Sequence, residues 1–60
     1  MYQLHIDETY YNISTAAQAY AAYNNAVRFL ENVSGQHRLV LVDCEAADKG
    51  EPCVIRSCEV

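Results

Sequence analysis

The chain has 60 residues, so it forms one domain, and a chain of this size buries only ~60% of its unfolded surface. Its formal net charge is −4, from eight Asp and Glu against four Lys and Arg. That balance disfavours direct nucleic-acid binding, because such affinity comes mainly from Lys and Arg that neutralise phosphates. Hydrophobic residues make up 52% of the chain, so composition does not predict disorder.

The beginning of the sequence carries no export or membrane signal. Residues 1–5 lack the basic and apolar regions of a signal peptide. No apolar run approaches the length of a membrane span. We therefore expect a cytoplasmic protein without membrane contact.

A period of two near the start predicts a hairpin. Residues 2–6 alternate between apolar and polar side chains, as in a half-buried strand. Asp7 and Glu8 then form a turn, and residues 10–13 form a return strand that is rich in strand formers. Tyr10 is expected to face away from the core. The residues expected on the core face of this hairpin include Tyr2, Tyr11 and Ile13.

Residues 15–33 carry the only long helical period in the chain. Thr15 and Gln18 have the spacing of a capping box. Gly35 stands where a left-handed C′ residue would end the helix. At ~100° per residue, the apolar side chains gather on one side that needs a surface to cover. That side comprises Ala16, Ala19, Tyr20, Tyr23, Ala26, Val27 and Leu30, flanked by Ala22, Phe29 and Val33.

The second half predicts another hairpin. Residues 37–46 include a Leu-Val-Leu-Val run, which is the strongest strand signal in the chain. Residues 48–50 form a turn in which glycine supplies the positive φ. Pro52 is compatible with a strand start or edge, and residues 53–59 form the last strand. The element order is β-β-α-β-β. The sequence therefore predicts a single α+β domain, with one helix packed on a small antiparallel sheet of up to four strands.

The two faces of the second hairpin can be assigned from its turn. A turn at 48–49 aligns three pairs of residues on one face: Val40 opposite Ser57, Val42 opposite Ile55, and Cys44 opposite Cys53. Because that face carries no charge, we place it beneath the helix. Leu39, Leu41 and Val54 then share an exposed face, where grouped apolar residues mark a contact surface. A slip of one residue exchanges the faces, and the alternative is that Leu39 and Leu41 pack against the helix.

The sequence offers little for catalysis or metal binding. Cys44 and Cys53 could form a cross-strand bridge, but in a reducing cytoplasm we expect buried thiols. The spacings C-x8-C and C-x4-C do not match the close pairs of zinc sites. Asp43 and Glu45 point to opposite faces of a strand, so they do not form a carboxylate pair. We expect no catalytic residue, no metal and no cofactor, and therefore a protein that is not an enzyme.

Acidic residues around the turns point to a protein partner. Glu45, Asp48 and Glu51 surround the second turn, with Lys49 among them. The first turn adds to the same field if both turns lie at one end. A basic groove is the complementary surface, whereas the other interpretation of these charges is solubility alone. The candidate partner-binding residues, with Tyr10 and Leu41 as apolar anchors, are Asp7, Glu8, Tyr10, Leu41, Glu45, Asp48 and Glu51.

The size, acidic charge, alanine-rich helix and element order of the whole chain resemble small phage-encoded accessory proteins of the anti-CRISPR inhibitor type, without a family-specific motif. The resemblance implies a protein that blocks a nucleic-acid-handling complex in the host cytoplasm by binding it. The alternative is a small regulatory, antitoxin-like protein that acts as a homodimer, although four scattered Lys and Arg disfavour a DNA-reading segment. We expect a monomer, or a weak homodimer through an edge strand or through the Leu39, Leu41 and Val54 face.

Overall fold

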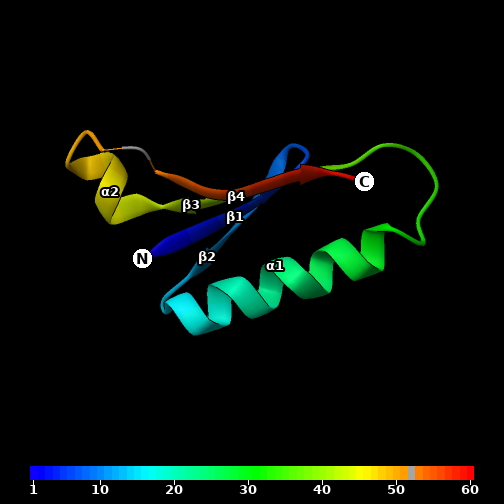
Figure 1. Cartoon of the computed structure of the whole chain (residues 1–60), viewed down its shortest axis with the longest axis horizontal. Helices are drawn as coiled ribbons and strands as arrows, with labels where there is room; N and C mark the ends of the chain where they lie inside the picture. The colour runs from blue at the N-terminus through cyan, green and yellow to red at the C-terminus, as the bar shows by residue number, and fades with distance from the viewer. Residues whose placement is uncertain (52) are drawn as a thin grey trace.

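The computed structural model describes residues 1–51 and 53–60, in which one long helix packs on a single antiparallel sheet. The strands lie in the order β2-β1-β3-β4, and α1 lies along one face of the sheet (Figure 1). The predicted α+β domain is confirmed. The described elements are β1 (Tyr2–Ile6), β2 (Thr9–Ile13), α1 (Ala16–Leu30), β3 (Arg38–Asp43), α2 (Cys44–Asp48) and β4 (Val54–Glu59).

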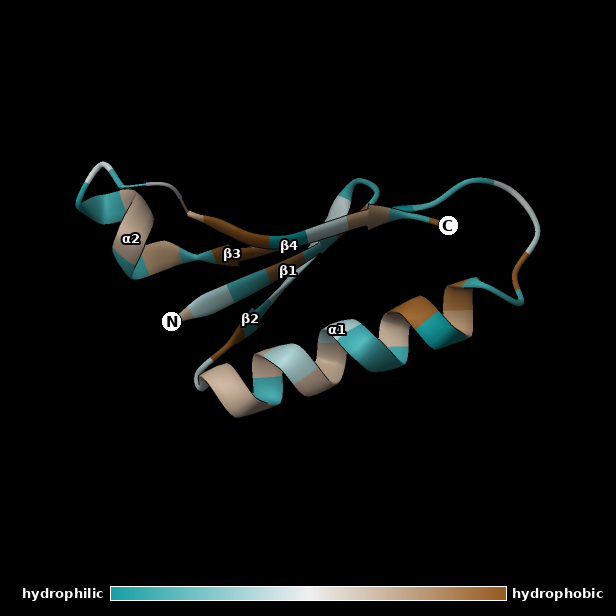
Figure 2. Ribbon diagram, in the orientation of Figure 1, coloured by the Kyte–Doolittle hydropathy of each residue, from teal (hydrophilic) through white to brown (hydrophobic). Residues whose placement is uncertain are grey.

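Helix α1 begins where the capping spacing places it. The Thr15 hydroxyl oxygen accepts the Gln18 backbone N–H at 3.3 Å. The Ser14 hydroxyl donates to the Gln18 side chain at 3.5 Å, so only half of the predicted capping box forms. Figure 2 shows hydrophobic and hydrophilic residues alternating around the turns of α1, as expected of a helix with one apolar side. Ala19, Tyr23 and Leu30 are its buried residues.

The predicted end of this helix was wrong. The helix stops at Leu30 rather than at residue 33. The Glu31 N–H still bonds four residues back, to the Val27 carbonyl, but the N–H groups of Asn32 and Val33 bond three residues back, to the carbonyls of Phe29 and Leu30. This tightening of the last turn satisfies carbonyls that would otherwise lack partners. Gly35 does have a positive φ of 100°, but it lies in the following loop and not at C′.

The core lies between α1 and the face of the sheet that carries three leucines. Leu39 and Leu41 expose 0% of their surface, and Leu4, which pairs with Leu41, is also buried. The expectation that Leu39 and Leu41 lie on an exposed face was therefore wrong, and the alternative assignment is the one that the structure has. Leucine buries more apolar area than valine does, which favours this face as the core.

A bulge explains part of the error in assigning the two faces of the second hairpin. Val40 pairs with Ser57 as predicted. A shift in register directly before Val42 makes that residue pair with Val54 rather than with Ile55. A bulge places two residues of one strand opposite one of the other, so one simple alternation cannot assign faces along the whole hairpin.

The charges on the leucine face also misled the prediction, because they lie at its margins. Arg56 places its guanidinium 5.3 Å from the centre of the Tyr20 ring and remains exposed. Its aliphatic stem can cover apolar surface while its charged head stays in water. Asp43 lies at the end of β3, where it caps a second helix. Neither charge is buried beneath α1.

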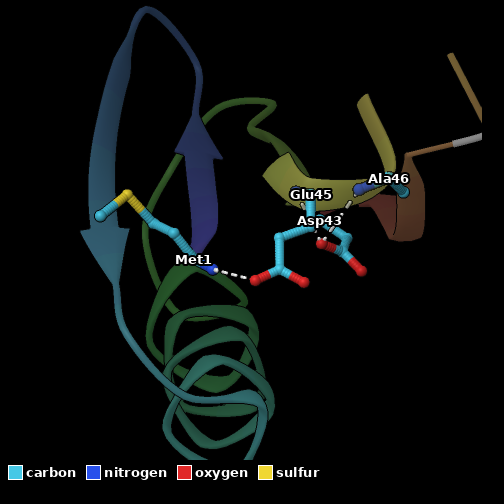
Figure 3. A network of polar contacts seen from close by, with 4 residues as sticks. All are labelled: Met1, Asp43, Glu45 and Ala46. Carbon is cyan, nitrogen blue, oxygen red and sulfur yellow. Dashed lines mark hydrogen bonds and ion pairs between the residues drawn. The ribbon is translucent and has the colours of Figure 1, made fainter. Parts of the chain in front are cut away.

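The connection between β3 and β4 is a short helix rather than the predicted extended strand and turn. The Asp43 carboxylate accepts the backbone N–H groups of Glu45 at 3.0 Å and Ala46 at 3.4 Å (Figure 3). This cap starts α2, which ends at Asp48 with Lys49 as its C-cap residue. Gly50 follows with a φ of 72°, as predicted for the turn.

The last strand agrees closely with expectation, whereas the cysteines are less buried than expected. β4 begins at Val54, one residue later than predicted, and the prediction for Pro52 lies outside the described residues. Cys44, Cys53 and Cys58 are free thiols of intermediate burial. The structure therefore has the reduced form rather than a bridge.

Candidate protein-binding surfaces

One face of the sheet carries no covering layer within the described part of the chain. α1 lies on the opposite face (Figure 1). We call the uncovered side the open face, and the strand register places on it the side chains that alternate with the core residues. They come from all four strands and form two rows. The rows are Tyr10–His5–Val40–Ser57 and Asn12–Gln3–Val42–Val54.

Three valines of the open face form an apolar patch on β3 and β4. We call Val40, Val42 and Val54 the valine patch. Val54 is 54% exposed, and Val40 and Val42 are half-buried. Two of the valines line a hollow of about 270 Å³. The same hollow is bounded by Arg38 and Glu59, whose side chains approach within 3.6 Å of each other. The patch is thus a shallow apolar surface with a charged rim.

The other half of the open face is polar and pre-organised. The rings of His5 and Tyr10 stack with centroids 5.5 Å apart. His5 Nε2 lies 3.1 Å from the Gln3 side-chain oxygen, and the Gln3 amide donates to the Asn12 side-chain oxygen at 3.1 Å. The predicted outward placement of Tyr10 is confirmed. Its ring is more than half exposed and is held by its neighbour.

The carboxylates predicted at a hairpin tip lie instead along α2 and the turn after it. We call Glu45, Asp48 and Glu51 the acidic segment, and all three side chains are exposed. Glu45 lies 3.9 Å from the amino nitrogen of Met1 (Figure 3). Both groups of this pair are largely exposed, so it constrains the carboxylate weakly. The acidic segment remains available to a partner, with Lys49 as the one opposing side-chain charge within it.

The acidic segment and the valine patch lie at the same end of the sheet. Val42 is the last residue but one of β3, which runs directly into α2. Val54 is the first residue of β4, and it pairs with Val42. The chain therefore leaves the valine patch, forms the acidic segment and returns to the valine patch.

The first turn lies at the opposite end of the sheet. The Cys44 N–H donates to the Met1 carbonyl at one end of β1, whereas the Asp7 N–H donates to the Arg38 carbonyl at the other. Asp7 and Glu8 consequently do not share a field with the acidic segment. The condition under which the first turn would add to that field is therefore not met, because antiparallel strands return each connection to alternate ends.

Asp7 is also engaged within the chain. With a φ of 53°, its carboxylate accepts the Arg38 backbone N–H at 3.0 Å and lies 3.0 Å from His37 Nδ1. The bond from Arg38, followed by that from His37, lowers the pKa of the Asp7 carboxyl. The same contact with Asp7 raises the pKa of His37. Asp7 is therefore a fold-stabilising residue, whereas Glu8 beside it is exposed.

Leu41 is the predicted partner-binding residue that the structure excludes. It has no exposed surface, so no partner can touch it in the folded domain. Val40 and Val42, which we had assigned to the core, take the exposed positions instead. The alternating Leu-Val run left both assignments open, and only the size of leucine favoured its burial.

The described residues contain no group of three or more His, Cys, Asp or Glu that could hold a metal ion. The helices among them are all too short or too polar to cross a membrane. No protein-family model matches the chain, and neither does any curated protein or solved structure. A functional proposal must therefore be built from the surfaces described above.

Proposed function

We propose that this chain is a non-enzymatic inhibitor that binds another protein through the valine patch and the acidic segment together. One observation carries the proposal: three exposed carboxylates adjoin a patch of three valines on a sheet face that no described segment of the chain covers. Apolar surface that is grouped on one face and rimmed by polar groups marks protein contacts. Scattered single residues, such as Phe29 on α1, carry no such meaning.

The valine patch and the acidic segment contribute to binding in different ways. The valines supply apolar burial at the centre of the contact, where most binding energy is concentrated. The carboxylates supply charge complementarity, which raises the association rate and selects the partner. The partner therefore has an apolar pocket flanked by Lys and Arg.

A basic groove that normally holds nucleic acid fits this description. In such a groove, carboxylates of the acidic segment take the positions of phosphates, and the bound domain blocks access. This is inhibition by occupancy, of the kind that the resemblance to anti-CRISPR inhibitors implies. The site of action is the cytoplasm, and that of the host if the protein is phage-encoded.

Tyr10 is the second anchor on the same face. Its ring is exposed yet stacked on His5, so less side-chain freedom is lost when a partner covers it. It comes from the opposite edge strand to Val54. A partner that contacts both residues must span the sheet.

The test begins with capture of a partner from a lysate of the source cells and continues with the purified pair. Affinity is measured for the parent, for Val54→Lys, and for the triple variant Glu45→Lys, Asp48→Lys, Glu51→Lys. Phe29→Lys is the control, because Phe29 is 70% exposed and lies on α1. We expect Val54→Lys to weaken binding by about tenfold or more, as a charge placed in a buried contact does.

Binding measurements at two salt concentrations separate the contribution of the acidic segment from that of the valine patch. Parent binding should weaken at high salt, because exposed charges are screened, and the triple variant should lose that dependence together with its affinity. Phe29→Lys should bind like the parent at both concentrations. Unchanged affinity in both Val54→Lys and the triple variant would contradict the proposal.

A further inference from the structure

The two edges of the sheet are constructed differently. β4 is protected: it carries the bulge, its Arg56 side chain donates to the Ile55 carbonyl at 2.9 Å, and Glu59 pairs with a basic side chain. Such devices discourage a further strand from pairing. β2, with the sequence TYYNI, has neither a charge nor a proline, and its pairing with β1 has no bulge. It is the unprotected edge.

Hydrogen bonds at both ends of β1 show which backbone groups point outward. The Asp7 N–H bonds the Arg38 carbonyl, and the Cys44 N–H bonds the Met1 carbonyl. Both bonds join the odd-numbered residues that flank β1, Met1 and Asp7, to the β3 side. Because backbone groups of an extended strand alternate in direction, the even-numbered residues of β1 face β2.

On β2 the same alternation leaves two residues unpaired. Tyr11 lies opposite Leu4, so its backbone groups face β1. The N–H and C=O groups of Tyr10 and Asn12 consequently point away from the sheet. All three residues are exposed, so neither α1 nor another described segment covers this edge.

We propose that this edge pairs antiparallel with β2 of a second copy of the chain, on a two-fold axis at Tyr11. In that register, Tyr10 of each copy lies opposite Asn12 of the other, and each such pair exchanges two N–H···O bonds. Tyr11 lies opposite itself in a non-hydrogen-bonded pair, where side chains approach most closely and aromatic pairs are favourable.

The sequence of this edge favours β2 of a second copy of the chain as the strand that pairs with it. The two outward residues flank Tyr11 symmetrically, so the strand is complementary to itself. Its lack of charge avoids repulsion at the contact between two chains of net charge −4. Tyr11 is 54% exposed on the helix side, so α1 leaves room for the second ring. Tyr11 thus lies on the predicted core face of the sheet, but its ring is not buried in a single copy of the chain.

This dimer does not depend on the proposed inhibitor function, although it would extend it. The axis stands perpendicular to the sheet, so both copies of α1 lie on one side. The two open faces join on the other side into one continuous surface. A dimer would therefore present two valine patches and two Tyr10 rings together.

Sedimentation equilibrium of the full chain tests the proposal. The parent should show a concentration-dependent monomer–dimer equilibrium up to about 1 mM. Tyr11→Lys should weaken dimerisation by about tenfold or more, because it sets like charges directly opposite each other. Phe29→Lys, which adds the same charge at another exposed position, should dimerise like the parent. A parent that stays monomeric throughout, or equal loss in both variants, would overturn the proposal.

A cross-linking experiment tests independently whether the two-fold axis lies at Tyr11. Cα atoms of a non-hydrogen-bonded antiparallel pair are ~4.5 Å apart, within the range that a disulfide spans. Mild oxidation of Tyr11→Cys should therefore yield a covalent dimer well above the background of the parent and of Phe29→Cys. No excess over Phe29→Cys would overturn the register. Val54→Lys distinguishes the two proposals, because it should lose the captured partner and keep the dimer.

Discussion

The helix-covered face and the open face of the sheet differ in burial, and the strand β3 shows the difference most clearly. Along β3, Leu39 and Leu41 are completely buried beneath α1, whereas Val40 and Val42 between and beyond them face the open side. Adjacent residues of β3 therefore differ: the leucines contribute to the core, and the valines lie on the open face. The leucines hold this small domain together, and the valines are the residues that the proposed contact with a partner would use.

The largest expected effect is a loss of stability when a leucine on the helix-covered face is truncated. Leu41→Ala should cost about 2–5 kcal/mol, a large share of the stability of a 60-residue domain. Val40→Ala, one residue away, should cost less than about 1 kcal/mol, because it removes half-exposed atoms. Urea denaturation of both variants measures the difference. Equal costs would mean that the two faces of β3 are not distinct.

A smaller effect tests how closely the helix approaches the sheet. Ala19 has no exposed surface, so Ala19→Leu should overpack the contact and cost about 1–3 kcal/mol. Ala16 lies on the same helix but is exposed, and Ala16→Leu should change stability by about 0.5 kcal/mol or less. Thermal melts of the pair give the comparison. A neutral Ala19→Leu would indicate a looser contact than the structure shows.

The smallest effect comes from a contact that belongs to neither face. Contact with Asp7 raises the pKa of His37 above 6.5, so the stabilisation it gives is present below that value and is lost as pH rises through the raised pKa. The pKa of Asp7 is lowered from 3.8, so its contribution is lost as pH falls through the lowered value. The pair should therefore stabilise most between pH 3.8 and 6.5.

Melts of the parent and of His37→Gln, from pH 3.8 to pH values beyond the raised His37 pKa, measure the contribution. The parent should lose stability relative to the variant as pH rises beyond the raised His37 pKa. A constant difference between the two proteins at all pH values would contradict the assignment. Because the pair joins the β1–β2 turn to the start of β3, Leu41→Ala and Ala19→Leu should keep the same pH dependence.

The sequence predicted the elements well where local patterns decide them. Thr15 marks the start of α1, the alternation of residues 2–6 marks β1, and Gly50 marks a turn. Two local features were nevertheless missed. The end of α1 depends on how the last carbonyls are satisfied, and the α2 helix was missed although Asp43 precedes the helix formers Glu45 and Ala46.

The candidate surfaces followed the same division. Exposure of Tyr10 and of the acidic segment could be predicted, because a turn region and an outward strand position are local features. Leu41 could not be placed, since a Leu-Val-Leu-Val run is apolar on both faces and only the tertiary contact with α1 chooses between them. The bulge before Val42 had no signal in the sequence that we could identify.

The most direct test of the two-faced sheet is a solvent paramagnetic relaxation measurement on the methyl groups of β3 and β4. A soluble paramagnetic agent broadens exposed methyl resonances and leaves buried ones sharp. The structure predicts strong broadening for Val54, intermediate broadening for Val40 and Val42, and almost none for Leu39 and Leu41. Sharp valine resonances beside broadened leucine resonances would contradict the account, because the helix would then cover the other face.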